Sequence, residues 1–267
     1  MPERPAGGPP LVGIGVLVTR PAHQADRLVG LIEQAGGTAI RFPTIEIGPP
    51  RDPEQLRDAL RRLSDFDLAV FVSPNAVEQT FRRLEAERHR WPSDITVACV
   101  GRASARALER FGIHPLAPER RYDSEALLAL PALQQVAGRR VVIFRGDGGR
   151  ELLAETLAER GATVTYVECY RRVRPAADAT PVLRAWRDGK VHVVSVTSTE
   201  GLHNLYDMLA EPGRGLLLGT PMIVLSEAQA AECRKLGFVH PARVVTEASD
   251  EAILEAIKVW RRSAFPL

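Results

Sequence analysis

Hydroxyl side chains stand where strongly apolar runs of the sequence give way to helical patterns. AVFVSPNAVEQ passes from a strand-like run through Ser73 into a helical pattern, and VSVTSTEGLHN does the same around Ser198. The free backbone N–H groups and the dipole at a helix N-terminus favour a bound anion by about 0.3–1 kcal/mol. Serine, threonine and asparagine are also ordinary helix N-caps, and this simpler interpretation suffices for any one of them alone. The chemistry that these positions predict is therefore anion binding.

Six strand ends of the sequence carry such a turn before a helix. Ligands of open α/β sheets bind beyond the carboxyl ends of the strands, so this recurrence favours a shared anion cleft over six independent caps. We expect the cleft to lie between two domains that face one another. The predicted binding residues are Thr19, Arg20, Ser73, Pro74, Asn75, Gly101, Arg102, Ser104, Arg145, Gly146, Thr197, Ser198, Thr199 and Ser226.

The elements that must position these residues are short β-branched runs that alternate with amphipathic helical patterns. This alternation is typical of parallel sheets with helical crossovers. The strand runs are apolar throughout, as expected when helices cover both faces of a sheet. About ten runs are present, and two five-stranded sheets suit a chain of 267 residues better than one sheet. The predicted fold class is α/β, with two doubly wound parallel-sheet domains, one inserted in the other and joined by a two-stranded β linker.

Two β-rich segments that end in proline, RFPTIEIGPP and VECYRRVRP, interrupt the helical rhythm. Five strand candidates lie between them, IHPLAP included, and five lie outside them. The chain would cross twice between the domains, so we expect the two segments to pair as an antiparallel hinge. The predicted divisions are 11–41 with 176–262 for the first domain, 51–166 for the inserted domain, 42–50 and 167–175 for the hinge linkers, and 1–10 for a disordered leader.

Composition and motifs exclude several functional classes. The net charge of +2 gives no strong nucleic-acid footprint, and no apolar run reaches the length of a membrane span. The histidines lack HxxH and HExxH spacing and the cysteines form no ligand pair, so we expect no metal. GDGGR lacks the GK[ST] of a P-loop, and GIGV stands in the wrong context for a dinucleotide turn. The GxSxG elbow of serine hydrolases is absent from the sequence.

The remaining chemistry is sparse. Cys99, Cys169 and Cys233 lie in apolar patterns, which predicts packed, reduced thiols and a cytoplasmic location. The sequence has no coiled-coil repeat or exposed apolar stripe, which favours a monomer. Tyr170 is a lone aromatic in the second linker. Such a residue is more often a packing residue, but its place between the domains leaves a functional role open.

Six stretches stand in a particular order and spacing: VLVTRPAHQADRLVGLIEQAGGTAIRFPTIEI, AVFVSPNAV, ACVGRASARALERFG, DSEALL, VVIFRGDGGRELLAETLAERGATVTYVECYRR and VTSTEGLHNL. In this order and spacing nearly the whole chain, from about Val16 to Ile257, resembles the uroporphyrinogen-III synthase family. The resemblance implies an inserted-domain fold and no cofactor. The implied substrate is hydroxymethylbilane, a linear tetrapyrrole with eight carboxylates, which is cyclised with inversion of its last ring and loss of water. Catalysis would then consist chiefly of positioning.

The resemblance also implies roles for particular residues. Tyr170 aligns with a tyrosine of the family's second linker and would donate a hydrogen bond or proton to the departing hydroxyl. Arg20 and Arg145 would pair with substrate carboxylates. The strand-end hydroxyls assigned to carboxylate binding are Ser73, Ser104, Thr197, Ser198 and Ser226.

This sequence departs from the family pattern at three places. Val72 and Ser104 stand where many members carry threonine. Glu227 follows Ser226 and would repel a propionate if it faced the cleft. Two alternatives to the synthase remain open: a hinged two-domain protein that binds a small anion without chemistry, and a two-domain glycosyl or nucleotide-sugar transferase. The second would need a diphosphate-binding glycine loop, which the sequence lacks.

Overall fold

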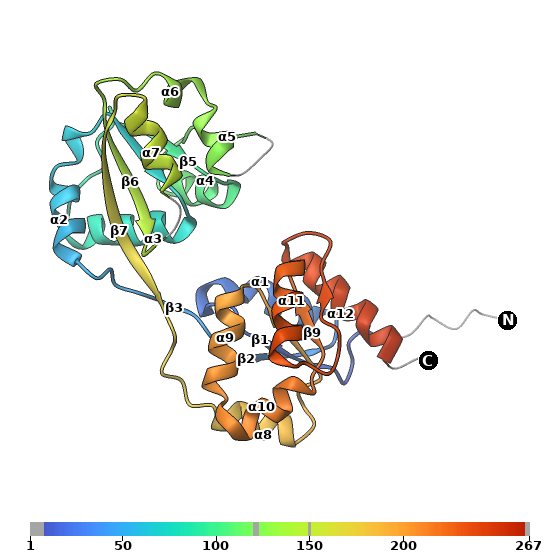
Figure 1. Cartoon of the computed structure of the whole chain (residues 1–267). Coiled ribbons are helices and arrows are strands. Elements are labelled where there is room, and N and C mark those ends of the chain that lie inside the picture. The colour runs from blue at the N-terminus through green and yellow to red at the C-terminus, as the bar shows by residue number, and fades with distance from the viewer. Residues whose placement is uncertain (1–7, 120–122, 149–150, 265–267) are drawn as a thin grey trace. The chain divides into compact units, whose positions relative to one another are not determined.

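The computed structural model describes residues 8–119, 123–148 and 151–264 of the chain. The chain divides into two compact units (Figure 1). We call residues 1–46 with 173–267 the outer unit, and residues 47–172 the inserted unit. The chain therefore passes between the units twice, once on either side of the inserted segment.

The outer unit is a parallel five-stranded sheet with helices on both faces. Its strands lie in the order β10 (Arg243–Val244), β9 (Met222–Val224), β8 (Val193–Val196), β1 (Gly15–Val18) and β2 (Thr38–Arg41). One face packs on α8 (Thr180–Arg187), α9 (Thr199–Met208), α10 (Ala210–Leu218) and α11 (Glu227–Leu236). The other face packs on α1 (Ala22–Gln34) and α12 (Asp250–Ala264). Strand side chains alternate between the two cores, so both faces of the strands must be apolar.

The inserted unit repeats this architecture. Its sheet has the order β3 (Glu46–Gly48), β7 (Thr163–Val173), β6 (Arg140–Gly146), β4 (Leu68–Phe71) and β5 (Thr96–Cys99). One face packs on α2 (Pro53–Arg61), α3 (Pro74–Ala86) and α4 (Arg102–Glu109), with the short 3-10 helix η1 (Leu63–Asp65) following α2. The other face packs on α5 (Ser124–Leu128), α6 (Pro131–Gln134) and α7 (Leu152–Glu159). The predicted α/β class with two five-stranded sheets is confirmed in the described residues.

One predicted strand of the inserted unit is wrong. The IHPLAP segment contributes a single bridge, between Leu116 and Ala98, instead of a strand. The Leu116 N–H donates to the Val97 carbonyl at 2.8 Å, and the Leu116 carbonyl accepts from the Cys99 N–H at 2.9 Å. Proline at 115 and at 118 has no N–H to continue the ladder. The fifth strand of this sheet is β3, which lies in the first predicted linker.

The two predicted linkers contain neighbouring strands, but these strands do not form a ladder separate from the two sheets. β3 and β7 are hydrogen-bonded neighbours, but both belong to the sheet of the inserted unit. β7 is 11 residues long, and Val167, where the second linker was predicted to begin, still pairs with Phe144 of β6. The β6–β7 ladder therefore extends into the segment assigned to the linker. Of the predicted leader, residues 1–7 lie outside the described residues, and the Pro9 carbonyl accepts a hydrogen bond from the Val12 N–H.

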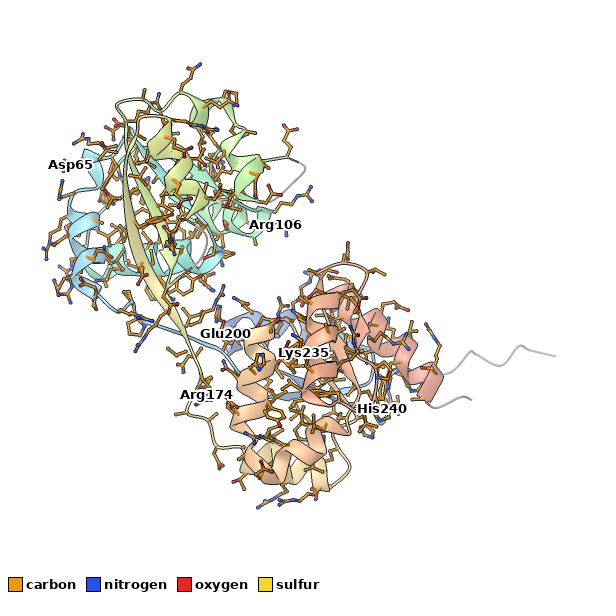
Figure 2. All side chains as sticks on the ribbon, in the orientation of Figure 1. Asp65, Arg106, Arg174, Glu200, Lys235 and His240 are labelled. Carbon is orange, nitrogen blue, oxygen red and sulfur yellow. The ribbon has the colours of Figure 1, made fainter. Side chains whose placement is uncertain are left out.

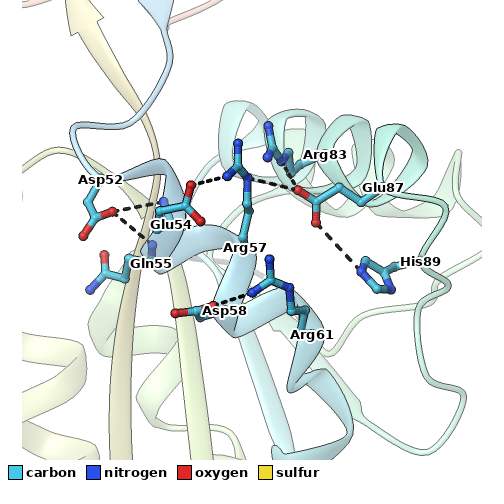
Figure 3. Close-up of polar contacts among 9 residues, drawn as sticks. All are labelled: Asp52, Glu54, Gln55, Arg57, Asp58, Arg61, Arg83, Glu87 and His89. Carbon is cyan, nitrogen blue, oxygen red and sulfur yellow. Dashed lines mark hydrogen bonds and ion pairs between the residues drawn. The ribbon is translucent and has the colours of Figure 1, made fainter.

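Charged side chains project from both units, as Asp65 and Arg106 do from the inserted unit (Figure 2). A cluster of such groups joins α2 to α3 (Figure 3). Asp52 caps α2, with its carboxylate accepting the N–H groups of Glu54 and Gln55 at 3.0 and 3.1 Å. On α3, the Glu87 carboxylate lies 3.4 Å from the Arg57 guanidinium and 2.6 Å from that of Arg83. Ion pairs near the protein surface contribute up to about 1 kcal/mol each, so the shared apolar core remains the main link between the two helices.

The three cysteine thiols are expected to resist alkylation in the folded protein. Burial is the largest cause that raises the pKa of Cys99 to about 11, of Cys169 to about 12 and of Cys233 to about 11. Because the thiolate is the reacting form, iodoacetamide at pH 8 should modify none of the three within minutes, and should modify all three after unfolding in guanidinium. Mass spectrometry of the intact chain counts the adducts.

Rapid modification of Cys169 in the native protein would contradict the buried state of this thiol.

The raised pKa values of the three thiols also predict an effect of pH on the stability of the protein. Each folded pKa exceeds the ordinary thiol pKa of 9.0, so the unfolded chain loses these protons first. The free energy of unfolding should therefore fall as the pH rises through the window from 9 towards 12.

Candidate functional site

The strand orders bring the predicted residues of each unit to one edge of its sheet. In the outer unit the order changes direction between β8 and β1, and in the inserted unit between β6 and β4. At such a switch point the following helices leave on opposite faces, which opens a crevice beyond the carboxyl ends of the two strands. Ser73 and Gly146 follow or end the two central strands of the inserted unit, and Thr19 and Thr197 follow those of the outer unit.

Ser73 forms the N-cap of α3 in the inserted unit. Its backbone is extended, with φ −157° and ψ 158°, and its Oγ accepts the Ala76 N–H at 3.1 Å. Pro74 occupies the first helical turn, where a missing N–H leaves no carbonyl unpaired. Ser73 is half-buried, while Asn75 is 8% exposed. Ser73 therefore caps the helix and remains partly exposed as a residue.

Tyr170 reaches this cap because of an irregularity in β7. Its hydroxyl lies 3.0 Å from Ser73 Oγ. In the β6–β7 ladder Arg145 pairs with Glu168 but Gly146 pairs with Tyr170, so β7 carries one extra residue, Cys169. Side chains alternate along a regular strand, but Cys169 and Tyr170 both pack in the core on the α3 side. The bulge thus turns Tyr170 towards Ser73, a use that bulges often have near functional sites.

Gly146 provides the surface on which the tyrosine ring lies. A Cβ at this position would stand 2.6 Å from Tyr170 Cζ and 2.9 Å from its hydroxyl oxygen. Any larger residue must displace the ring, so glycine is required here for close approach. The Asp147 N–H donates to the Tyr170 carbonyl at 3.0 Å and fixes the backbone beside the ring. Tyr170 therefore contacts both Ser73 and Gly146, although the sequence separates it from them by many residues.

The other predicted residues of the inserted unit are placed less favourably for a ligand. Gly101 is the N-cap of α4 and Arg102 is exposed, but Ser104 lies inside the first turn and is 2% exposed. Arg145 is 7% exposed. Its guanidinium lies 3.1 Å from a Glu151 carboxylate oxygen and 4.5 Å from the centre of the Tyr166 ring. The charge of Arg145 is thus already engaged within the unit.

Two serine caps mark the carboxyl edge of the outer unit. Ser198 caps α9 and accepts the Gly201 N–H at 2.9 Å, and Ser226 caps α11 and accepts the Gln229 N–H at 3.3 Å. Both serines and Thr197 are half-buried, and Thr199 is exposed. These residues are thus partly or fully exposed at the ends of neighbouring strands.

Thr19 and Arg20 are held inside the outer unit. Thr19 is 3% exposed and its hydroxyl donates to the Ser195 carbonyl at 2.8 Å, which joins β1 to β8. Arg20 forms an ion pair with Asp250, which is 9% exposed at the start of α12. Burial raises the pKa of the Asp250 carboxyl, and the Arg20 charge opposes that rise. Sequence reasoning did not identify Asp250 as the partner of this arginine.

Sequence reasoning also missed the hydrogen bonds that hold the segment after β2 in place. Thr44 is fully buried, and its N–H and hydroxyl both donate to the Thr19 carbonyl, at 3.1 and 3.2 Å. The Asn204 amide of α9 donates to the Thr44 carbonyl at 2.9 Å. At Gly201 a Cβ would stand 3.2 Å from Thr44 Oγ1 and 3.0 Å from Ser198 Oγ. The sequence signal was that glycine itself, because glycine in a first helical turn otherwise lowers helix stability.

The described residues contain no group of three or more histidine, cysteine, aspartate or glutamate side chains that could hold a metal ion. No helix within the described part of the chain is long and apolar enough to cross a bilayer. The two sheet edges carry hydroxyls, backbone amides at helix starts and one buried phenol.

Comparisons with known proteins agree on one family. The family described as "Uroporphyrinogen-III synthase HemD" matches residues 26–255. A uroporphyrinogen-III synthase from Escherichia coli is 37% identical, over 92% of this chain and 100% of its own length. One from Synechococcus elongatus is 31% identical, over 95% of this chain and 97% of its own length.

Two solved structures share the fold at low identity. A mutant uroporphyrinogen III synthase from Thermus thermophilus matches with a TM-score of 0.59 and 19% identity, over 94% of this chain and 98% of that one. A uroporphyrinogen-III synthetase from Helicobacter pylori matches with a TM-score of 0.58 and 15% identity, over 93% of this chain and 100% of that one.

Proposed function

This chain belongs to the uroporphyrinogen-III synthase family, and we propose that it cyclises hydroxymethylbilane to uroporphyrinogen III with loss of water. The observation that carries the proposal is the match to a synthase at 37% identity over 92% of this chain and the whole of the relative. A reaction that eliminates water while closing a ring belongs to the lyases.

The proposed reaction begins with loss of the terminal hydroxyl of the bilane, which leaves an electrophilic azafulvene. The substituted carbon of the far ring attacks it and gives a spirocyclic pyrrolenine. Fragmentation and reclosure then invert the last ring. The free bilane closes by itself to the uninverted isomer, so the protein must chiefly fix the shape of a flexible chain, which is catalysis by positioning.

The arrangement at the sheet edges supports binding of a polyanion. Ser73, Ser198 and Ser226 each accept one N–H group of the first helical turn that follows and remain half-buried. The other free N–H groups of each first turn point out of the N-terminal end of the helix. An anion bound there gains about 0.3–1 kcal/mol from the helix dipole. We propose that these edges bind substrate carboxylates, with Thr197, Thr199 and Gly101 contributing.

Arg20 and Arg145 contribute less to carboxylate binding than the sequence suggests. Arg20 is paired with Asp250 and Arg145 with Glu151, so a substrate carboxylate would compete with a partner already in place. We propose that their main role is to hold the strand ends in register. We also propose that the Tyr170 phenol is the source of the proton for the departing hydroxyl, because the fold brings it to the switch point of the inserted unit.

We further propose that the protein acts as a cytoplasmic monomer and needs no metal or organic cofactor. The modest net charge of +2 argues against a nucleic-acid partner. A small-molecule substrate fits the hydroxyl and amide groups at the two sheet edges.

The proposed activity is tested by supplying hydroxymethylbilane freshly made by the enzyme that precedes this step. The product is oxidised and its isomers are separated by chromatography. The purified chain should yield isomer III, whereas a reaction without protein should yield isomer I. Isomer I alone at high protein concentration would overturn the assignment, and saturable binding of the bilane in that case would support an anion-binding protein instead.

A further inference from the structure

We propose that the Ser73 hydroxyl delivers the proton to the departing hydroxyl of the substrate, and that Tyr170 acts through Ser73. This inference rests on the proposed function and deepens it. Sequence reasoning assigned Ser73 to carboxylate binding and Tyr170 to direct contact with the substrate. The structure changes this division of roles, because the two hydroxyl groups differ in burial and are only 3.0 Å apart.

Burial decides which of the two hydroxyls can touch a substrate. Tyr170 is 3% exposed and packs within the core shared by β7 and α3. Its ring is covered on one side by the backbone at Gly146, where even a Cβ would stand 2.6 Å from Cζ. Ser73 is half-buried at the second position beyond β4, at the switch point of the sheet. A ligand at this edge meets the serine before it meets the phenol.

The hydrogen-bond capacity of Ser73 allows a proton to pass from Tyr170 through Ser73 to a ligand. A serine hydroxyl has one donor hydrogen and two acceptor lone pairs. The Ala76 N–H donates to one lone pair at 3.1 Å. If the Tyr170 O–H donates to the other, the serine hydrogen is left for a group outside. The reverse arrangement would make the phenol of Tyr170 the donor to the substrate, although this residue is only 3% exposed.

The proton balance of the step is closed. The Ser73 hydrogen passes to the terminal hydroxyl of hydroxymethylbilane as its bond to carbon breaks, and that oxygen leaves as water. The Tyr170 hydrogen passes to Ser73 Oγ at the same time. The terminal pyrrole N–H releases a proton as the azafulvene forms, and this proton restores the phenol through the same serine. The net change is loss of one water from the substrate, with the protein unchanged.

The relay is tested by kinetics of Ser73→Ala, Ser73→Thr, Tyr170→Phe and the double variant Ser73→Ala/Tyr170→Phe. We expect Ser73→Ala to lower kcat about 100-fold or more, the usual range for loss of a general acid, with KM changed less than about threefold. Ser73→Thr keeps the hydroxyl and the extended cap, so it should recover most of kcat. The double variant should be no slower than Tyr170→Phe alone, because both changes break one path.

Two outcomes would overturn the relay. One is a rise in KM with unchanged kcat in Ser73→Ala. The other is a double variant whose loss of rate equals the product of the two single losses. Either outcome would show that the residues act independently. Asp52→Ala is the matched control: it removes the side-chain cap of α2 in the same unit and should shift the thermal midpoint as Ser73→Ala does, with kcat unchanged. Failure of the proposed function is distinguishable, because the unaltered chain would then form no isomer III.

Discussion

Replacing Tyr170 with phenylalanine is expected to lower kcat about 100-fold or more and to leave the protein folded. The phenol is the proposed source of the proton for the leaving hydroxyl, and loss of a general acid usually reduces rates by 10²–10⁴, roughly. The ring itself stays, so its packing on Gly146 and in the core is retained. Only the hydrogen bond to Ser73 is lost, which should reduce the free energy of unfolding by about 1 kcal/mol.

The measurement is single-turnover formation of uroporphyrinogen III from fresh hydroxymethylbilane, with urea unfolding as the check on stability. Tyr206→Phe is the control, since Tyr206 lies on α9 with the Arg214 guanidinium 4.4 Å from its ring centre, far along the sequence from the bulge. That variant should keep the full rate. A Tyr170→Phe protein with an unchanged rate would remove the phenol from the mechanism.

Gly15→Ala is expected to destabilise the outer unit by about 3 kcal/mol or more, at the upper end of overpacking effects. Gly15 begins β1, and a Cβ there would stand 1.6 Å from the Lys190 carbonyl oxygen. The obstacle is backbone and cannot rotate away. The Gly15 N–H also donates to His192 Nδ1, and its carbonyl accepts the His192 N–H, both at 2.9 Å. A shift of β1 would therefore break its contacts with the segment before β8.

Urea unfolding followed by circular dichroism measures the loss, and Gly30→Ala is the matched control. Gly30 lies inside α1, where a new Cβ meets nothing within 4 Å. Alanine there should raise the free energy of unfolding by about 1 kcal/mol, because alanine is the better helix former. If Gly15→Ala unfolded at the same urea concentration as the unaltered protein, the close approach of residues 15 and 190 would be wrong.

The sequence predicts the architecture well because the signals are local. Strands buried on both faces read as continuous apolar runs, and Asp52, Ser73 and Ser198 mark helix starts that the structure contains. The prediction fails where pairing depends on partners far along the chain. IHPLAP has a strand's apolar content, but its prolines prevent a ladder, and β3 becomes a strand only because β7 extends far enough to pair with it.

The candidate site also has features that the sequence predicts and features that it does not. Its strand-end positions follow from the alternation of runs and caps, so Ser73 and Ser226 could be found from sequence alone. The contact between Ser73 and Tyr170 spans 97 residues and depends on a one-residue bulge that leaves no local pattern. Likewise, only the fold shows that Arg20 is neutralised by Asp250. The partners of charged residues are set by packing, so the hydrophobic periodicity of the sequence does not reveal them.

The strand order of the outer unit has a consequence for synthesis on the ribosome. β1 and β2 emerge first, yet the next strand beside β1 is β8, and Val16 pairs with Val193. The nascent chain must therefore hold an apolar, half-made sheet while the whole inserted unit is translated. That unit has all five of its strands available before β8 exists. Ribosome-bound chains long enough for residue 172 to have left the exit tunnel, with β8 still inside it, should thus carry a protease-resistant inserted unit beside an N-terminal segment that is still cleaved.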